Sequence, residues 1–150
     1  MDVIFHTWRE FMTEKIGDKT DRDTEQVSQV IVSNKDKKIL LLKRSDDQSW
    51  QPNKWALPGG HVEEDEPYSV AGARETKEEA GIDVTNLQSY NFPEKEKETL
   101  HYFKADFEGD NEEVEINFEH SDYVWVSEDE LDNYEIVASV KKLLKKIFTS

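Results

Sequence analysis

Residues 60–82 read GHVEEDEPYSVAGARETKEEAGI and carry the strongest pattern in the chain. Pro67 is a favoured residue of a first helical turn, and Gly81 is favoured just past a helix end, so a helix is predicted between them. At about 100° per residue, one face of this helix collects a cation and three acids. These residues are Arg74, Glu75, Glu78 and Glu79.

Three carboxylates on one helix face repel one another, and partial burial strengthens the repulsion. A bound divalent cation removes this repulsion. Oxygen ligands without His or Cys select Mg²⁺, Mn²⁺ or Ca²⁺, and Mg²⁺ commonly shares its ligands with substrate phosphates. The residues alone therefore favour phosphate chemistry at a metal site. The alternative for an isolated pattern of this kind is a solvated, Glu-rich helix face.

The spacing of these residues resembles the signature of the Nudix hydrolase superfamily. Its fixed positions are filled without a gap by Gly60, Glu66, Arg74, Glu75, Glu78, Glu79, Gly81 and Ile82. Thr76 is a mild departure, since an aliphatic residue is more usual there. Segments 55–63 (WALPGGHVE) and 119–126 (EHSDYVWV) extend the resemblance. It implies an α/β fold class, with the Nudix fold of an α/β/α sandwich around a mixed, curved β-sheet.

The resemblance also implies an activity. Nudix hydrolases use water and divalent ions to cleave a diphosphate linkage in a nucleoside diphosphate that is joined to another group. The chain is therefore expected to be a Mg²⁺-dependent pyrophosphohydrolase acting on phosphoric anhydride bonds, with Mn²⁺ as a substitute ion. The alternative is a nucleotide-binding Nudix module without catalysis. Such modules commonly lose glutamates of the signature, whereas all four are present here.

The metal ligands of the family carry over to this sequence residue by residue. Glu79 would be the principal ligand, and Glu75, Glu78 and the backbone carbonyl of Gly59 would complete the set. A carboxylate must also accept the proton of the attacking water. Glu75 inside the signature and Glu119 outside it are the two candidates for this base, Glu75 ahead of Glu119. Glu119 is also expected to be a further metal ligand.

Other residues of the signature would support this centre. Arg74 would orient Glu75 through a charge-assisted contact. Glu66 would brace the junction between loop and helix or hold a water. Gly60 and Gly81 are expected to have structural roles.

The nucleotide substrate is left undecided by the sequence. Arg44, at the end of a predicted strand, could reach a phosphate, although a strand-end arginine is more often a solubilising charge. Trp50, in the following loop, could stack on a base. Residues that mark the ADP-ribose and dinucleoside polyphosphate subfamilies are not at the expected positions. A nucleoside triphosphate, a nucleotide sugar or a related nucleotide stays open.

Apolar patterns on both sides of the signature predict the remaining elements. QVSQVIVS (26–33) and KKILLLKRS (37–45) flank a turn and predict a hairpin. Strand-like segments recur near 82–91, 98–107 and 122–127, and an apolar stripe predicts a C-terminal helix. Residues 3–16 predict an additional amphipathic helix. We therefore expect an N-terminal helix and linker at 1–24 and a Nudix hydrolase domain at 25–150.

The composition limits the compartment and the partners. The length of 150 residues suits one domain, and 34 Asp and Glu against 19 Lys and Arg give a net charge of −15. This charge disfavours nucleic acids and anionic membranes as partners, so a nucleotide is the expected one. The chain has no cysteine, no long apolar run and no signal-peptide pattern, which predicts a cytoplasmic protein. A homodimer built through the helix at 3–16 stays open.

Overall fold

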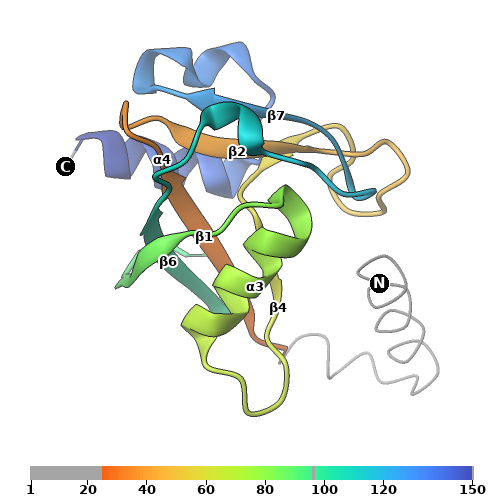
Figure 1. Cartoon of the computed structure of the whole chain (residues 1–150), viewed down its shortest axis with the longest axis vertical. Helices are drawn as coiled ribbons and strands as arrows, with labels where there is room; N and C mark the ends of the chain where they lie inside the picture. The colour runs from red at the N-terminus through yellow and green to blue at the C-terminus, as the bar shows by residue number, and fades with distance from the viewer. Residues whose placement is uncertain (1–24, 96, 150) are drawn as a thin grey trace.

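The computed structural model describes residues 25–95 and 97–149. The predicted N-terminal helix and linker, residues 1–24, lie outside the described residues. The described elements are β1 (Val27–Ser33), β2 (Ile39–Arg44), β3 (Trp55–Ala56), β4 (Gly59–His61), α3 (Tyr68–Ala80), β5 (Thr85–Tyr90), β6 (Leu100–Asp106), η1 (Asn111–Glu113), β7 (His120–Val126), η2 (Glu128–Asn133) and α4 (Ala138–Thr149). Figure 1 shows α3 on one side of the sheet and α4 on the other. No helix among these elements is long and apolar enough to cross a membrane.

Strands β1 and β2 form the predicted hairpin. The side-chain oxygen of Asn34 closes its turn by accepting hydrogen bonds from the amides of Asp36 at 3.0 Å and Lys38 at 2.9 Å. Asn side chains commonly stabilise turns in this way. The two strands pair where Ser33 lies opposite Ile39 and then take different partners. Figure 1 shows them diverging from the hairpin.

Strand β1 lies at the centre of a mixed sheet. It pairs in parallel with β6 along its whole length, from Val27 opposite Leu100 to Ser33 opposite Asp106. It also pairs antiparallel with β4. Strand β2 pairs antiparallel with β7 and β3, and β5 pairs antiparallel with β6. The predicted mixed sheet is confirmed.

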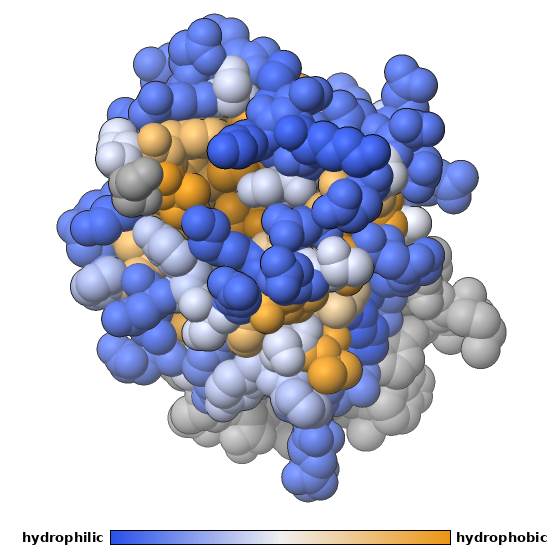
Figure 2. Space-filling model, turned by 60° about the vertical axis from the view of Figure 1, so that its left-hand side comes forward, coloured by the Kyte–Doolittle hydropathy of each residue, from blue (hydrophilic) through white to orange (hydrophobic). Residues whose placement is uncertain are grey.

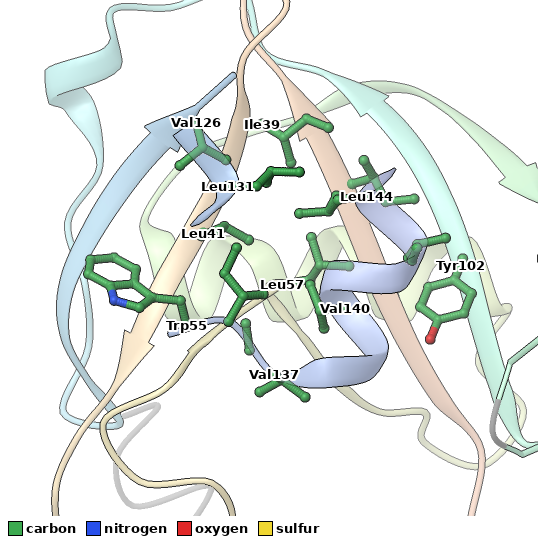
Figure 3. Close-up of a cluster of buried hydrophobic side chains, with 14 of the residues drawn as sticks. Ile39, Leu41, Trp55, Leu57, Tyr102, Val126, Leu131, Val137, Val140 and Leu144 are labelled. Atoms are coloured by element: carbon green, nitrogen blue, oxygen red, sulfur yellow. The ribbon is translucent and has the colours of Figure 1, made fainter. Parts of the chain in front are cut away.

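A hydrophobic core lies between the sheet and α4. Successive side chains of a strand point to opposite faces, so alternate residues of β1 and β2 reach this core. Ile31, Ile39 and Leu41 belong to it, together with Val140 and Leu144 of α4. Figure 3 shows the α4 side chains facing those of the strands. This packing explains the apolar stripe from which the C-terminal helix was predicted.

Helix α3 packs on the opposite face, so the α/β/α sandwich is confirmed. Val30 of β1 shares a second hydrophobic core with Ala80 at the end of this helix. Gly72 allows a close approach, because a Cβ atom there would lie 2.9 Å from Cγ2 of Val30. Pro67 precedes the helix and Gly81 follows it in the left-handed conformation, with φ 70°, as the signature predicted.

An open depression of about 550 Å³ lies beside the first turn of α3. Its lining includes Tyr68, Lys95 and His101. The rings of Tyr68 and His101 are stacked with their centroids 3.8 Å apart, which joins α3 to β6. Figure 2 shows the side of the molecule that carries β5 and β6, where hydrophobic side chains emerge between hydrophilic ones.

Candidate active site

The acidic face of α3 is largely buried. Glu75 is fully buried and Glu79 is 4% exposed, while Glu78 is partly exposed. Glu75 and Glu79 share this buried flank with Ala71 and Gly72, because the helix lies over β1 and β4. A solvated helix face is therefore excluded for Glu75 and Glu79.

Arg74 ties these acids to the loop that precedes α3. Its Nε and Nη2 donate hydrogen bonds to Glu66 at 2.8 and 3.0 Å. Its Nη1 donates to Glu75 at 2.9 Å and to Glu78 at 3.2 Å, and Nη2 also donates to the carbonyl of His61 at 3.1 Å. Glu66 foremost and then Glu75 raise the pKa of Arg74 above its ordinary value, against the opposite effect of burial. Arg74 thus lies directly against Glu75.

Two glycines bring β4 close to α3. A Cβ atom on Gly60 would lie 2.5 Å from Cδ of Glu75, and one on Gly59 would overlap the carbonyl oxygen of Ser28. Gly59 also has a φ of 155°, which residues other than glycine rarely adopt. Its amide donates a hydrogen bond to Oε1 of Glu79 at 3.3 Å. The predicted role of the Gly59 carbonyl as a metal ligand stays a prediction.

Glu79 is buried close to other acids. Its burial, followed by the charges of Glu75 and Glu119, raises its pKa well above the ordinary value of a glutamate. The hydrogen bond from the Gly59 amide acts in the opposite direction. A cation between these groups would offset the cost of keeping them ionised.

Glu119 reaches this cluster from the loop that precedes β7. The amide of Ser45 donates to its carbonyl at 2.9 Å, and the side-chain oxygen of Asn117 accepts a hydrogen bond from its amide at 3.1 Å. The charge of Glu119 acts on the pKa values of both Glu79 and Arg44. The fold therefore brings Glu119 to the signature residues, from about forty positions farther along the chain.

Arg44 and Trp50 lie together at the edge of the same cluster. The Nε of Arg44 donates to the carbonyl of Trp50 at 2.7 Å, and its guanidinium carbon lies 5.0 Å from the Trp50 ring centroid. Burial lowers the pKa of Arg44, while the charges of Glu119 and Glu79 oppose that change. Trp50 is 49% exposed. Arg44 thus contacts the Trp50 loop, and its predicted role in phosphate binding stays a prediction.

The donor set suits a hard divalent cation. Four carboxylates are available from Glu75, Glu78, Glu79 and Glu119, and ligands of this chemistry favour Mg²⁺, Mn²⁺ or Ca²⁺. In the part of the chain that the structure describes, no three Asp, Glu or His side chains already converge as a finished metal site. Arg74 holds Glu75 and Glu78, while Glu79 faces the Gly59 amide. The burial of Glu75 and Glu79 next to each other, which raises the pKa of Glu79, supports the fit.

Asn117 and Ser45 are contact residues that the sequence reasoning did not single out. Each holds the backbone of the loop that carries Glu119. An Asn two residues before a Glu of interest is a usable signal, because Asn side chains often bind the amide two positions ahead. No comparable signal marks Ser45, whose contact depends on the pairing of β2 with β7.

The fold is an α/β/α sandwich, and it places the partly buried Arg74 and the buried Glu75 and Glu79 against the glycine pair of β4. The chain belongs to the Nudix family, since the family described as the NUDIX domain matches residues 24–147. It is accordingly a Nudix hydrolase.

Named relatives and solved structures agree with this family. The nucleoside triphosphatases NudI of Escherichia coli O17:K52:H18 (strain UMN026) and Shigella flexneri are each 34% identical, over 71% of this chain and 84% of theirs. The MutT protein of Methanosarcina mazei Go1 is 27% identical, with a TM-score of 0.62 over 81% of this chain and 91% of that one. An Ap4A hydrolase of C. elegans, 24% identical, shares the fold with a TM-score of 0.63 over 83% of this chain and 96% of its own.

Proposed function

We propose that this Nudix hydrolase is a Mg²⁺-dependent pyrophosphohydrolase that cleaves a diphosphate linkage in a nucleotide. The observation that carries the proposal is the crowding of Glu79 with Glu75 and Glu119 in a buried place. Among the substrates left open by the sequence, nucleoside triphosphates are favoured over nucleotide sugars, because relatives at 34% identity are named nucleoside triphosphatases.

The residues divide the reaction among them. Glu79, Glu75, Glu78 and Glu119 would hold the ion, which supplies positive charge for the phosphoryl oxygens when it is bound. Water attacks a phosphorus atom, the bond from that phosphorus to the bridging oxygen breaks, and the leaving phosphate departs with that oxygen. Glu75 or Glu119 accepts the proton of the water.

Arg44 and Trp50 would bind the substrate beside this centre. A guanidinium forms charge-assisted hydrogen bonds with phosphate oxygens, and arginine keeps its charge at neutral pH even where burial lowers its pKa. Trp50 orients Arg44 through its carbonyl and presents an exposed ring for stacking on a base. Arg44 would then contact the phosphate of a nucleotide, and Trp50 would contact its base.

A substrate panel tests the proposal. The purified protein is assayed with nucleoside triphosphates, nucleotide sugars, ADP-ribose, dinucleoside polyphosphates and capped RNA, with Mg²⁺ or Mn²⁺ and without metal. We expect turnover of a nucleoside triphosphate only with metal, and a fall in kcat of about a hundredfold or more in Glu79→Gln, because several kcal/mol of charge stabilisation is lost. Glu98→Gln is the matched control, since the Glu98 side chain is 99% exposed.

Two results would contradict the proposal. If wild-type protein turns over no diphosphate substrate with either metal while Mg²⁺ and nucleotide still bind, the chain is a non-catalytic nucleotide-binding module. If Glu79→Gln and Glu98→Gln behave alike in an active enzyme, the site lies elsewhere. Comparing Glu75→Gln with Glu119→Gln identifies the base, because its loss lowers kcat even at saturating Mn²⁺, whereas the loss of a ligand alone is offset by added metal.

A further inference from the structure

The segment that leads to Glu119 caps the end of α3. The last carbonyl groups of a helix lack partners within the helix itself. Here the amide of Glu115 donates to the carbonyl of Ala80 at 2.8 Å, and the amide of Asn117 donates to the carbonyl of Glu79 at 3.2 Å. Asn117 thus binds the backbone of the residue whose carboxylate lies in the candidate site.

The side chain of Asn117 holds the next part of the loop. Its Oδ1 accepts a hydrogen bond from the Glu119 amide at 3.1 Å and lies 3.1 Å from Nδ1 of His120. The Asn117 carbonyl also accepts from the His120 amide at 3.2 Å. Because only the oxygen of an Asn side chain can accept from a backbone amide, the orientation of this side chain is fixed. The arrangement is a turn of the Asx type.

The other side of the loop is held by the end of β2. The amide of Ser45 donates to the carbonyl of Glu119 at 2.9 Å, and its Oγ donates to the carbonyl of Phe118 at 3.1 Å. Both backbone groups of Glu119 are therefore engaged, one by Asn117 and the other by Ser45. The side chain of Glu119 interacts through its charge with Glu79 and Arg44.

We propose that Asn117 is a positioning residue, which ties the Glu119 loop to the end of α3 and thereby holds the Glu119 carboxylate at the acidic cluster. One residue then sets the relative position of two carboxylates from distant parts of the chain. This inference rests on the proposed function only for its effect on catalysis. Its effect on the loop stands on the hydrogen bonds alone.

Alanine and serine substitutions test the role of the side chain. Asn117→Ala removes the acceptor of the Glu119 amide, and Asn117→Ser keeps a shorter one. We expect Asn117→Ala to lower kcat about tenfold, with KM nearly unchanged, because a displaced catalytic group costs rate. Its Mn²⁺ affinity, measured by calorimetry, is expected to fall about tenfold, and Asn117→Ser to recover most of both losses. Asn133→Ala, at an exposed position of η2, is the matched control.

Two further measurements separate positioning from general destabilisation. In a double-mutant cycle, Asn117→Ala should add less than about a twofold loss of kcat to Glu119→Gln, because both changes act through one group. Hydrogen exchange of the amides at 117–121 should accelerate in Asn117→Ala, while the amides of the β1 and β6 pair keep their protection. Circular dichroism confirms that the variants fold.

The outcomes are distinct for the two proposals. An unchanged kcat and unchanged exchange in folded Asn117→Ala would overturn the inference, as would additive losses in the double-mutant cycle. If the wild-type protein shows no hydrolase activity, the proposed function fails, but the exchange and Mn²⁺ measurements still decide whether Asn117 positions Glu119. If Asn117→Ala does not fold, the same readouts in Asn117→Ser decide the question. Exchange and Mn²⁺ affinity equal to those of the wild type would support the role of the shared acceptor. A loss of affinity without faster exchange would overturn it.

Discussion

Gly60 lies so close to the carboxylate of Glu75 that no side chain fits between them. Gly60→Ala is expected to leave the fold intact and to lower kcat by about a hundredfold, because the added methyl group displaces the buried carboxylate that we propose for catalysis. Steady-state kinetics and circular dichroism check this. Full activity in a folded Gly60→Ala protein would show that Glu75 can move without cost.

Arg74 distributes one charge among three acids. Arg74→Lys keeps the charge but loses the forked geometry that contacts Glu66, Glu75 and Glu78 together. We expect the free energy of unfolding to fall by about 2 kcal/mol, since partly buried acids are left with a poorer partner. Urea denaturation in metal-free buffer measures this loss. Unchanged stability would mean that the forked geometry of Arg74 has no net stabilising effect.

Residue spacing predicted the acids and Arg74, but not how deeply they are buried. The burial of Glu75 depends on the approach of β4, where the lack of a side chain on Gly60 leaves room for the Glu75 carboxylate. The contact of Arg44 with the cluster depends on the pairing of β2 with β7. Such contacts join segments that are far apart in sequence, and a local pattern carries no information about them. Ser45 was missed for the same reason.

At the scale of elements, the stack of Tyr68 on His101 joins α3 to β6. Burial and then the charge of Lys95 lower the pKa of His101, and its Nε2 lies 2.6 Å from Oε1 of Gln26. The folded state binds a proton at His101 less readily than the unfolded chain does. The contribution of His101 to the free energy of unfolding is therefore fully present above the pKa of histidine in the unfolded chain, about 6.5. It is lost as the pH falls through that value toward the lower folded one.

His101→Phe keeps an aromatic ring on Tyr68 and removes the titration. We expect the wild-type protein to lose stability relative to this variant when the pH falls from neutral to mildly acidic. Thermal unfolding of both proteins across this range gives the difference. A constant difference would show that His101 does not contribute to the pH dependence.

The ends of α3 and the turn of the hairpin were the most predictable features of the fold. Pro67 and Gly81 bound α3 as expected, and Asn34 turns the β1–β2 hairpin. The pairing partners were not predictable, because β1 finds β6 and β2 finds β7 only through the whole fold. The mostly exposed pattern of β5 is explained by its position at the edge of the sheet.

At the scale of the whole molecule, we propose that residues 25–150 are the catalytic domain. A chain that starts at residue 25 is expected to fold and to keep kcat within about twofold, because β1 to α4 contain every residue assigned to the site. Kinetics and circular dichroism check this. Loss of folding would show that residues 1–24 belong to the domain.

Light scattering of the full chain and of the shortened chain tests dimerisation. A mass of the shortened chain about half that of the full chain would support a homodimer through 3–16.

The parallel pairing of β1 with β6 also sets the order of assembly. Parallel strands that are distant in sequence pay the entropy of closing a long loop before their contacts form, and they therefore pair slowly. Strand β2 also pairs with a strand that is distant in sequence, β7, although that pair is antiparallel. During synthesis, the hairpin, β4 and α3 emerge before β6 and β7, so the sheet beneath Glu75 and Glu79 is still incomplete and the loop that carries Glu119 is absent. A growing chain should therefore gain its acidic centre only after β7 has left the ribosome, which makes hydrolysis a property of nearly complete chains alone.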